Sequence, residues 1–213
     1  LIINLEAPIT DSSKAIENKV NLKIPYNSFY KTFQSQELYA VNLSNNHIFD
    51  FGIEGFKDTI DTLNQLNIKY FGVTDTKENI PFVIDKKIAV LSYCCKTTNP
   101  IFRMNKYFIH EINLDQIKKD LDRYKKQFNY IILQFHWGEE EISIPNPKDI
   151  KIARECIEYG ADLIIGNHSH VIQSSEEYKS KLIYYGIGNF IFDDLNEQSY
   201  FDGLKYKKKY IKN

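Results

Sequence analysis

Apolar residues follow two patterns along this chain, namely short continuous runs and positions spaced three or four residues apart. Short runs bounded by turn residues are typical of buried strands, whereas the wider spacing is typical of one face of a helix. The runs that predict strands cover residues 1–7, 38–44, 68–73, 82–85, 88–93, 130–135, 162–165 and 182–185. Strands that alternate with helices in this way predict an α/β fold with a largely parallel sheet, to which hairpins add antiparallel edges.

Three segments combine helical spacing with start or stop signals. The first follows Gly52, and its apolar face is formed by Ile53, Phe56, Ile60, Leu63 and Leu66. It lies between two predicted strands, so the three elements form a βαβ unit with parallel strands. The second helix follows the N-cap residue Asn113, with Gln116 placed as in a capping box. The third has Pro147 at its first position and ends at Gly160.

The remaining segments have weaker patterns. Residues 11–21 are polar and predict a loop, residues 24–33 show no regular period, and residues 97–112 predict a long excursion. The sequence has no internal repeat and no low-complexity linker. We therefore expect one domain across residues 1–213.

Composition sets limits on the class of protein. Hydrophobic residues make up 43% of the 213 residues, which allows a sizeable core, and the formal net charge is -1. A charge this small creates no global field toward nucleic acid or a membrane surface. No run approaches the roughly 18 apolar residues that a membrane helix needs. The three cysteines, Cys94, Cys95 and Cys156, fit no disulfide framework, so we expect reduced thiols and, with them, a reducing compartment.

The two ends of the chain raise separate expectations. The opening LIINLEAP has the character of the second half of a strand, so we expect the domain to be truncated there and at its C-terminal end. An upstream segment could carry an anchor, and we expect a cytoplasmic or membrane-associated protein. The basic C-terminal LKYKKKYIKN predicts either a solvated tail or a patch for an anionic partner.

Four of the five histidines come directly after predicted strands. They are His47, His136, His168 and His170. Open α/β sheets place their ligand sites at the carboxyl ends of strands. We therefore expect these four side chains to share one site.

The segment GNHSH, residues 166–170, carries two of these imidazoles two positions apart. In an extended backbone they project to one side, and the small Ser169 leaves the approach open. They could bind one metal ion together or one each of a close pair, and the carboxylate of Glu6 could bridge two divalent ions. Glu6 could equally lie on the surface. His136, in FHWG, is a further candidate imidazole ligand.

The segment NNHIFD, residues 45–50, offers an amide ligand and a proton donor. The amide oxygen of Asn46 is a neutral candidate ligand. Asp50 could orient His47 and favour its imidazolium form, which could protonate a leaving oxygen. Asn45, Asn46 and Asp50 could also only form turns and cap the next helix, and both interpretations can hold at once.

Three further residues are candidate substrate contacts: Asn45, Trp137 as a wall of the site, and Asn189 in GIGNF. The two glycines before Asn189 could let backbone amides approach an anion or could form only a tight turn. The three consecutive acids 139–141 could cap the next segment or lie in solvent, and we expect them in solvent.

The motifs occur in a fixed order: NLEAPIT, NLSNNHIFDFGIEGFKDTIDTLNQLNIKYFGV, FHWGEE, YGADLIIGNHSHVIQ and LIYYGIGNFIFD. In this order they resemble the CapA/PgsA family, the bacterial capsule and poly-γ-glutamate synthesis proteins of the calcineurin-like metallophosphatase superfamily. The resemblance covers nearly the whole chain. It implies a four-layer α/β/β/α sandwich with mixed sheets and a centre of two divalent ions, Mn, Zn or Fe, at the strand ends.

The resemblance also implies a role for each motif residue. Glu6 resembles the bridging acid and Asn46 the amide ligand, while His47 with Asp50 resembles the general-acid pair. The imidazole ligands that the resemblance implies are His136, His168 and His170. The superfamily chemistry is attack on phosphorus by a metal-bound hydroxide.

The sequence departs from the family pattern at two points. Superfamily members usually supply an Asp from an earlier Gly-Asp strand, which this sequence lacks. Asn167 stands where many relatives have a further histidine, a change that looks tolerable because His168 and His170 are retained.

Two functions follow from the resemblance. One is a metal-dependent phosphoesterase with a phosphorylated substrate, acting in capsule or poly-γ-glutamate synthesis. The alternative is a non-catalytic subunit that keeps the fold and binds an anionic polymer or partner proteins of capsule synthesis. Membership of a pathway does not establish a reaction, so both stay open at the level of sequence.

Overall fold

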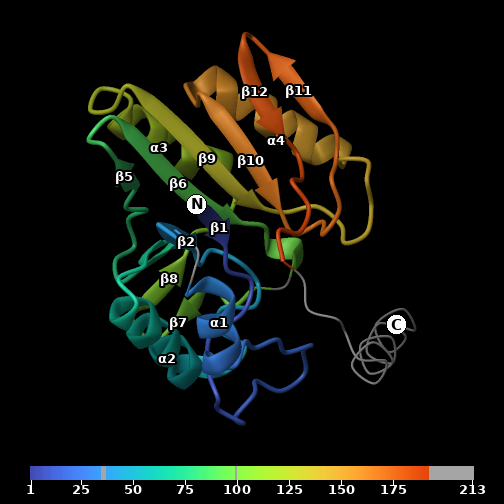
Figure 1. Ribbon diagram of the computed structural model, residues 1–213. Coiled ribbons are helices and arrows are strands. Elements are labelled where there is room, and N and C mark those ends of the chain that lie inside the picture. The colour runs from blue at the N-terminus through green and yellow to red at the C-terminus, as the bar shows by residue number, and fades with distance from the viewer. Residues whose placement is uncertain (35–36, 99, 192–213) are drawn as a thin grey trace.

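The computed structural model describes residues 1–34, 37–98 and 100–191, and its strands form three sheets (Figure 1). The basic C-terminal segment lies outside the described residues. The largest sheet has the strand order β11-β12-β10-β9-β6-β5. Its strands are β5 (Phe82–Ile84), β6 (Ile88–Cys94), β9 (Tyr130–His136), β10 (Leu163–Asn167), β11 (Ser175–Tyr178) and β12 (Lys181–Tyr184). The four central strands are parallel, while β5 and β11 pair antiparallel at the edges. The pattern predicted the hairpin of β5 and β6, but it did not predict β11.

Two smaller sheets complete the strands. The first is parallel and consists of β1 (Ile2–Asn4), β2 (Ala40–Asn42) and β3 (Lys69–Phe71). The second is antiparallel and consists of β4 (Val73–Thr74), β8 (Tyr107–Ile109) and β7 (Arg103–Met104). The helices of the described chain are α1 (Tyr26–Phe33), α2 (Gly52–Gln65), α3 (Leu114–Tyr124), α4 (Pro147–Tyr159) and the short 3₁₀ helix η1 (Lys96–Thr98). β2, α2 and β3 form the predicted βαβ unit.

The elements stack in four layers, which the buried clusters define. One cluster joins the outer face of the six-stranded sheet to α3 and α4, through residues such as Leu91, Leu133 and Ile117. A second, small cluster lies between the six-stranded sheet and the sheet of β1, β2 and β3, and contains Ala40 of β2 and Val90 of β6. The third joins β2 to α1 and α2. Figure 1 shows the same order, with α3 and α4 behind the large sheet and α1 and α2 in the lower half. The α/β/β/α order agrees with the predicted fold class.

The helices α3 and α4, which have the clearest start and stop signals in the sequence, have caps close to those predicted. Asn113 Oδ1 accepts from the Gln116 backbone N–H at 3.0 Å, but the Gln116 side chain donates to Asp120, so only half of the capping box forms. α4 has its proline in the first turn and ends at Gly160, whose φ of 116° is left-handed. Glycine adopts this conformation without steric cost.

Several expectations from the sequence need correction. The run 68–73 is split at Gly72, where φ is 88° and a Cβ would lie 2.2 Å from Asn42 Oδ1, so β3 ends and β4 joins another sheet. The irregular segment 24–33 contains α1, and the excursion 97–112 contains β7 and β8. These elements are short and are stabilised by tertiary packing, for which the local period gives no signal.

Candidate metal centre

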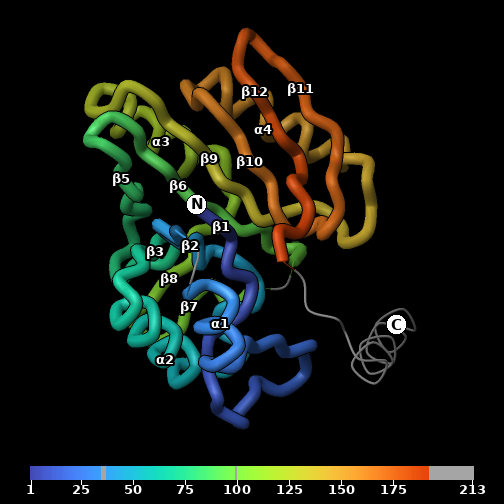
Figure 2. Tube along the Cα trace, viewed as in Figure 1, coloured from blue at the N-terminus to red at the C-terminus, as the bar shows by residue number. Residues whose placement is uncertain are grey.

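The candidate ligands come from the carboxyl ends of four strands that belong to two different sheets. Glu6 follows β1, Asn46 follows β2, His136 ends β9, and His168 and His170 follow β10. In Figure 2, β9 and β10 run toward the part of the molecule that contains β1 and β2. Packing of the six-stranded sheet against the sheet of β1, β2 and β3 therefore brings the carboxyl ends of their parallel strands to one place, as expected for this class of fold.

Glu6 is the centre of the cluster. Its Oε1 atom lies 3.3 Å from His136 Nε2, 3.6 Å from His168 Nδ1 and 3.8 Å from His170 Nε2. Asn46 Oδ1 lies 2.9 Å from His136 Nε2, which adds the amide oxygen to the same group. We call these five residues the strand-end cluster. The structure brings together every residue that the sequence proposed as a metal ligand.

The residues of the strand-end cluster are buried or half-buried, yet several of their buried polar atoms lack hydrogen-bond partners. Glu6 Oε1, His136 Nδ1 and His168 Nδ1 are such atoms. Buried polar atoms are normally paired, because an unpaired one costs about 1–3 kcal/mol. Three imidazoles, a carboxylate and an amide oxygen suit Mn, Zn or Fe. The donor set therefore fits a divalent metal ion.

The protonation states also suit metal ligands. Burial would raise the pKa of Glu6, but the neighbouring imidazoles, His136 first, hold it well below its usual value. Burial lowers the pKa of His136, which outweighs the opposing charge of Glu6. At neutral pH the cluster thus offers an ionised carboxylate and a neutral imidazole with a lone pair.

His47 and Asp50 form the predicted pair. His47 Nδ1 lies 2.6 Å from Asp50 Oδ2, and the Asp50 carboxylate is fully buried. The same Oδ2 accepts from the Leu22 backbone N–H at 2.7 Å. Asp50 does not cap α2, because its oxygens are used by these neighbours and the N-cap residue is Phe51.

Lys19 is a member of this group that the sequence interpretation missed. Its Nζ lies 2.5 Å from Asp50 Oδ1 and donates to the backbone oxygen of Asn46, and its side chain is only 10% exposed. The residue stands in the polar segment that predicted a loop, and a single lysine there gives no sequence signal. Only the folded chain shows that this loop supplies a buried counter-charge to Asp50.

The backbone of the GNHSH segment differs from the predicted extended form. His168 and His170 have φ values of 96° and 59°, both left-handed. Non-glycine residues in this region are strained, and such strain gathers at functional sites. Ser169 is 1% exposed and donates from Oγ to the Val171 carbonyl oxygen, so it supports the turn and does not serve as an open approach.

Two of the three predicted substrate contacts lie inside the protein. Asn45 is fully buried, and its Oδ1 accepts from the His47 and Ile48 backbone N–H groups. Trp137 is 1% exposed and donates from its indole nitrogen to the Tyr185 carbonyl oxygen at 2.9 Å. Both predictions need correction, because these side chains shape the loops and core beneath the site and are not accessible to a substrate.

Asn189 lies on the surface beside the cluster. Its Oδ1 is 2.9 Å from His170 Nδ1, so it orients that imidazole. The glycines before it form a structural turn: the Ile187 N–H donates to the Gly166 carbonyl, and a Cβ on Gly186 would lie 2.5 Å from Ser169 Oγ.

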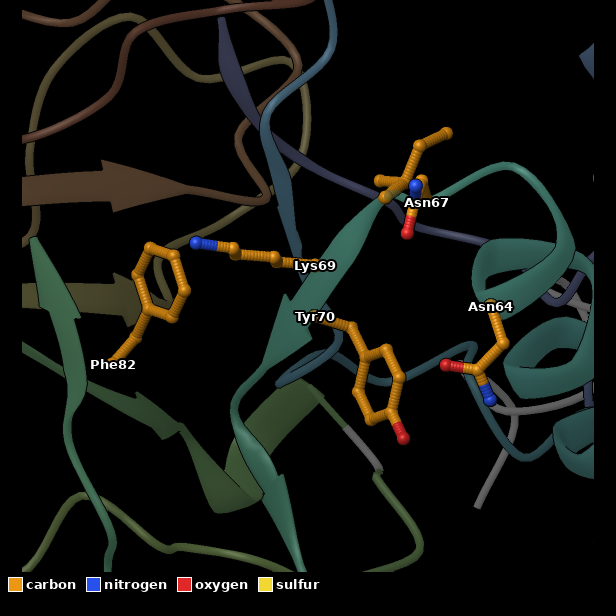
Figure 3. A pocket seen from close by; sticks show the side chains of 6 residues that line it. Asn64, Asn67, Lys69, Tyr70 and Phe82 are labelled. Carbon is orange, nitrogen blue, oxygen red and sulfur yellow. The ribbon is translucent and has the colours of Figure 1, made fainter.

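A shallow pocket of 390 Å³ lies elsewhere, around the amino end of β3 (Figure 3). It is lined by Asn64, Asn67, Ile68, Lys69, Tyr70 and Phe82. None of these residues belongs to the strand-end cluster, which lies at the carboxyl ends of the strands.

The cysteines and the helices add two findings. Cys94, Cys95 and Cys156 are all free thiols, and burial raises the pKa of Cys94 and of Cys156 to about 12. Across the described ranges, none of the helices has the length and apolar character required to cross a membrane.

A solved structure resembles the fold. It is titled "Putative 5'-Nucleotidase from Staphylococcus aureus in complex with alpha-ketoglutarate", and it matches with a TM-score of 0.55 over 86% of this chain and 44% of its own. The sequence identity is 15%, so the match shows a shared metallophosphatase-like fold and nothing about substrate.

Sequence comparison identifies relatives and a family. The capsule biosynthesis protein CapA of Bacillus anthracis is 28% identical over 89% of this chain and 49% of its own length. The PGA biosynthesis protein CapA of Bacillus subtilis is 28% identical over 89% of this chain and 52% of its own. The chain thus spans about half the length of these relatives. The model of the family described as bacterial capsule synthesis protein PGA_cap matches residues 1–194, and the chain therefore belongs to that family.

Proposed function

We propose that this protein is a metal-dependent phosphoesterase-type hydrolase of capsule or poly-γ-glutamate synthesis. The observation that carries the proposal is Glu6, whose buried Oε1 atom is surrounded by three imidazole nitrogens within 3.8 Å and has no hydrogen-bond partner. Buried atoms arranged in this way are costly to the fold unless a cation pairs with them. A metallophosphatase-like fold and membership of a capsule synthesis family support the same function.

The ligand roles follow from the contacts. Glu6, Asn46, His136, His168 and His170 would hold the divalent ions. A divalent ion at this position supplies Lewis-acid charge to phosphoryl oxygens and lowers the pKa of a bound water. Asn189 holds His170 in place through its 2.9 Å contact.

His47 has a separate role in the proposal. Asp50 fixes its imidazole by the 2.6 Å contact at Nδ1, so Nε2 is the nitrogen directed away from that pair. We assign His47 to proton donation to the leaving oxygen of the substrate. General acids of this kind contribute about 10²–10⁴-fold to the rate.

The experiment is hydrolysis of a phosphodiester dye by the purified chain loaded with Mn²⁺, Zn²⁺ or Fe²⁺. We expect turnover that requires metal and is lost in His168→Ala, while the exposed-residue control Glu139→Gln retains it. For His47→Asn, we expect a larger rate loss with an alkyl leaving group than with nitrophenolate, because the weaker leaving group needs the proton more.

A metal-loaded chain that hydrolyses no phosphoester would contradict the proposal. That result would favour the alternative, a non-catalytic subunit that binds an anionic polymer or partner proteins. Full polymer production by a His47→Asn and His168→Ala double variant in cells would do the same.

A further inference from the structure

Two groups of potential metal ligands overlap at His168. One is Glu6, His136 and His168, and the other is Glu140, His168 and His170. Within each group, one ligand atom from every residue lies within 4.8 Å of the others. The second group contains an acid that the sequence predicted to lie in solvent, and Glu140 therefore needs an explanation of its own.

The backbone around Glu140 is attached to the segment that carries the two histidines. The Trp137 N–H donates to the Asn167 carbonyl oxygen at 3.1 Å, and the Glu141 N–H donates to the Ser169 carbonyl oxygen at 2.9 Å. These two hydrogen bonds lie on either side of Glu140 along the chain. They join the loop after β9 to the loop after β10, so the position of Glu140 is tied to that of the two histidines.

Two unusual backbone angles turn one acid of three inward. Gly138 has a φ of 90° and Glu141 a φ of 63°. Between them Glu139 is exposed, Glu140 is half-buried beside the histidines, and Glu141 is exposed. Glu140 thus differs in environment from its two chemically identical neighbours, and of these three acids only Glu140 belongs to a group of potential ligands.

The imidazole of His170 is oriented so that one ring nitrogen faces the same group of potential ligands. Asn189 Oδ1 lies 2.9 Å from His170 Nδ1, where an amide oxygen accepts the Nδ1 proton. In that tautomer the lone pair is on Nε2, which lies 3.8 Å from Glu6 Oε1. A partner at the other ring nitrogen is the usual arrangement for a metal-binding histidine.

We propose that Glu140 is a carboxylate ligand of a divalent ion that His168 and His170 also bind, adjacent to the group formed by Glu6 and His136. The inference rests on the proposed metal-dependent function and adds to it a ligand from the loop after β9. An anionic oxygen beside two imidazoles is a donor set that Mn²⁺ and Zn²⁺ accept.

Mn²⁺ binding tests the proposal without any assay of activity. The full chain, Glu140→Gln and the matched control Glu139→Gln are dialysed against a series of Mn²⁺ concentrations, and bound metal is counted by mass spectrometry. We expect Glu140→Gln to lose one Mn²⁺ or to bind it at least about tenfold more weakly, a loss at the lower end of that seen for outer-shell partners of metal ligands. Glu139→Gln should match the parent chain, and Glu140→Asp should retain part of the affinity.

Electron paramagnetic resonance of the same samples gives a second readout. A direct ligand change alters the Mn²⁺ spectrum of Glu140→Gln, whereas the spectrum of Glu139→Gln stays that of the parent. Circular dichroism confirms that each variant is folded.

The two proposals fail in different ways. If Glu140→Gln binds Mn²⁺ in the same number and with the same affinity as Glu139→Gln, the assignment of Glu140 is wrong and the metal-dependent function stands. If the parent chain binds no Mn²⁺, Zn²⁺ or Fe²⁺, the proposed function itself is wrong, and the ligand role of Glu140 with it.

Discussion

Two polar clusters of this protein differ in how completely their carboxylate oxygens are hydrogen-bonded. In the cluster behind the large sheet, Tyr93 donates to Asp120 Oδ2 at 2.8 Å and Gln116 donates to Asp120 Oδ1 at 2.9 Å. Both carboxylate oxygens of Asp120 are therefore paired. In the strand-end cluster, Glu6 Oε2 accepts from the Asn4 side chain at 3.1 Å, but Oε1 has no such partner.

The difference separates a structural role from a binding role. Burial raises the pKa of Tyr93, so its hydroxyl keeps the proton that it donates to Asp120, and the first cluster is a matched network of hydrogen bonds. The strand-end cluster instead keeps the Glu6 carboxylate ionised among imidazoles, and the Oε1 atom of that carboxylate receives no hydrogen bond. Polar burial alone does not mark a functional site; in the strand-end cluster the unpartnered atoms belong to Glu6, His136 and His168, which are all potential metal ligands.

The largest expected effect is on stabilisation by metal. At a Mn²⁺ concentration 100-fold above the dissociation constant, the parent chain should gain about 2.7 kcal/mol in free energy of unfolding. His168→Asn should gain none, because it removes an imidazole shared by both ligand groups. Urea unfolding with Mn²⁺ and with a chelator measures the difference. An equal gain in both proteins would show that the strand-end cluster is not the metal site.

The next largest effect is expected from loss of Lys19, which forms an ion pair with the buried Asp50. Lys19→Met should lower the free energy of unfolding by about 2 kcal/mol, because it leaves a buried carboxylate with one partner fewer. Lys14→Met is the matched control, since Lys14 lies in the same loop with its side chain 80% exposed. Urea unfolding of the two variants should differ; if it does not, Lys19 contributes nothing to holding Asp50.

A third prediction concerns the cluster behind the sheet. Tyr93→Phe should lower the free energy of unfolding by about 1 kcal/mol, because Asp120 Oδ2 loses its donor. The full stabilisation by Mn²⁺ should remain, in contrast to His168→Asn. Tyr178→Phe, which removes a hydroxyl bonded to the exposed Glu158, should change unfolding by less than about 0.5 kcal/mol. Loss of metal stabilisation in Tyr93→Phe would show that the two clusters are coupled.

The smallest effect depends on pH and on Asp149, in the first turn of α4. Burial raises the pKa of Asp149 from its ordinary value of 3.8 to about 6, so the folded protein holds this proton more tightly than the unfolded chain. Asp149 therefore costs stability as the pH rises through that interval. Relative to Asp149→Asn, the parent chain should lose about 1 kcal/mol between about pH 4.5 and about pH 7, a value reduced for partial solvent screening.

If the stability of the parent chain relative to Asp149→Asn does not fall between about pH 4.5 and about pH 7, the burial of Asp149 does not perturb its titration.

Local sequence determined the elements that have strong periods and caps. The helix after Asn113 and the helix from Pro147 to Gly160 could be predicted because their capping groups lie within a few residues of one another. The placement of four histidines after strands also followed from the apolar runs alone. Those predictions depend on interactions between near neighbours in the chain, which sequence spacing displays directly.

Tertiary structure decided which of the candidate residues meet. Packing of two sheets brings Glu6 to His170, and a loop distant in sequence brings Lys19 to Asp50. Trp137 turns into the core because its N–H finds the Tyr185 carbonyl. Glu140 differs from Glu139 only through left-handed angles and hydrogen bonds to another loop. These contacts depend on partners far away in sequence, so they could not be predicted from residue type and local spacing.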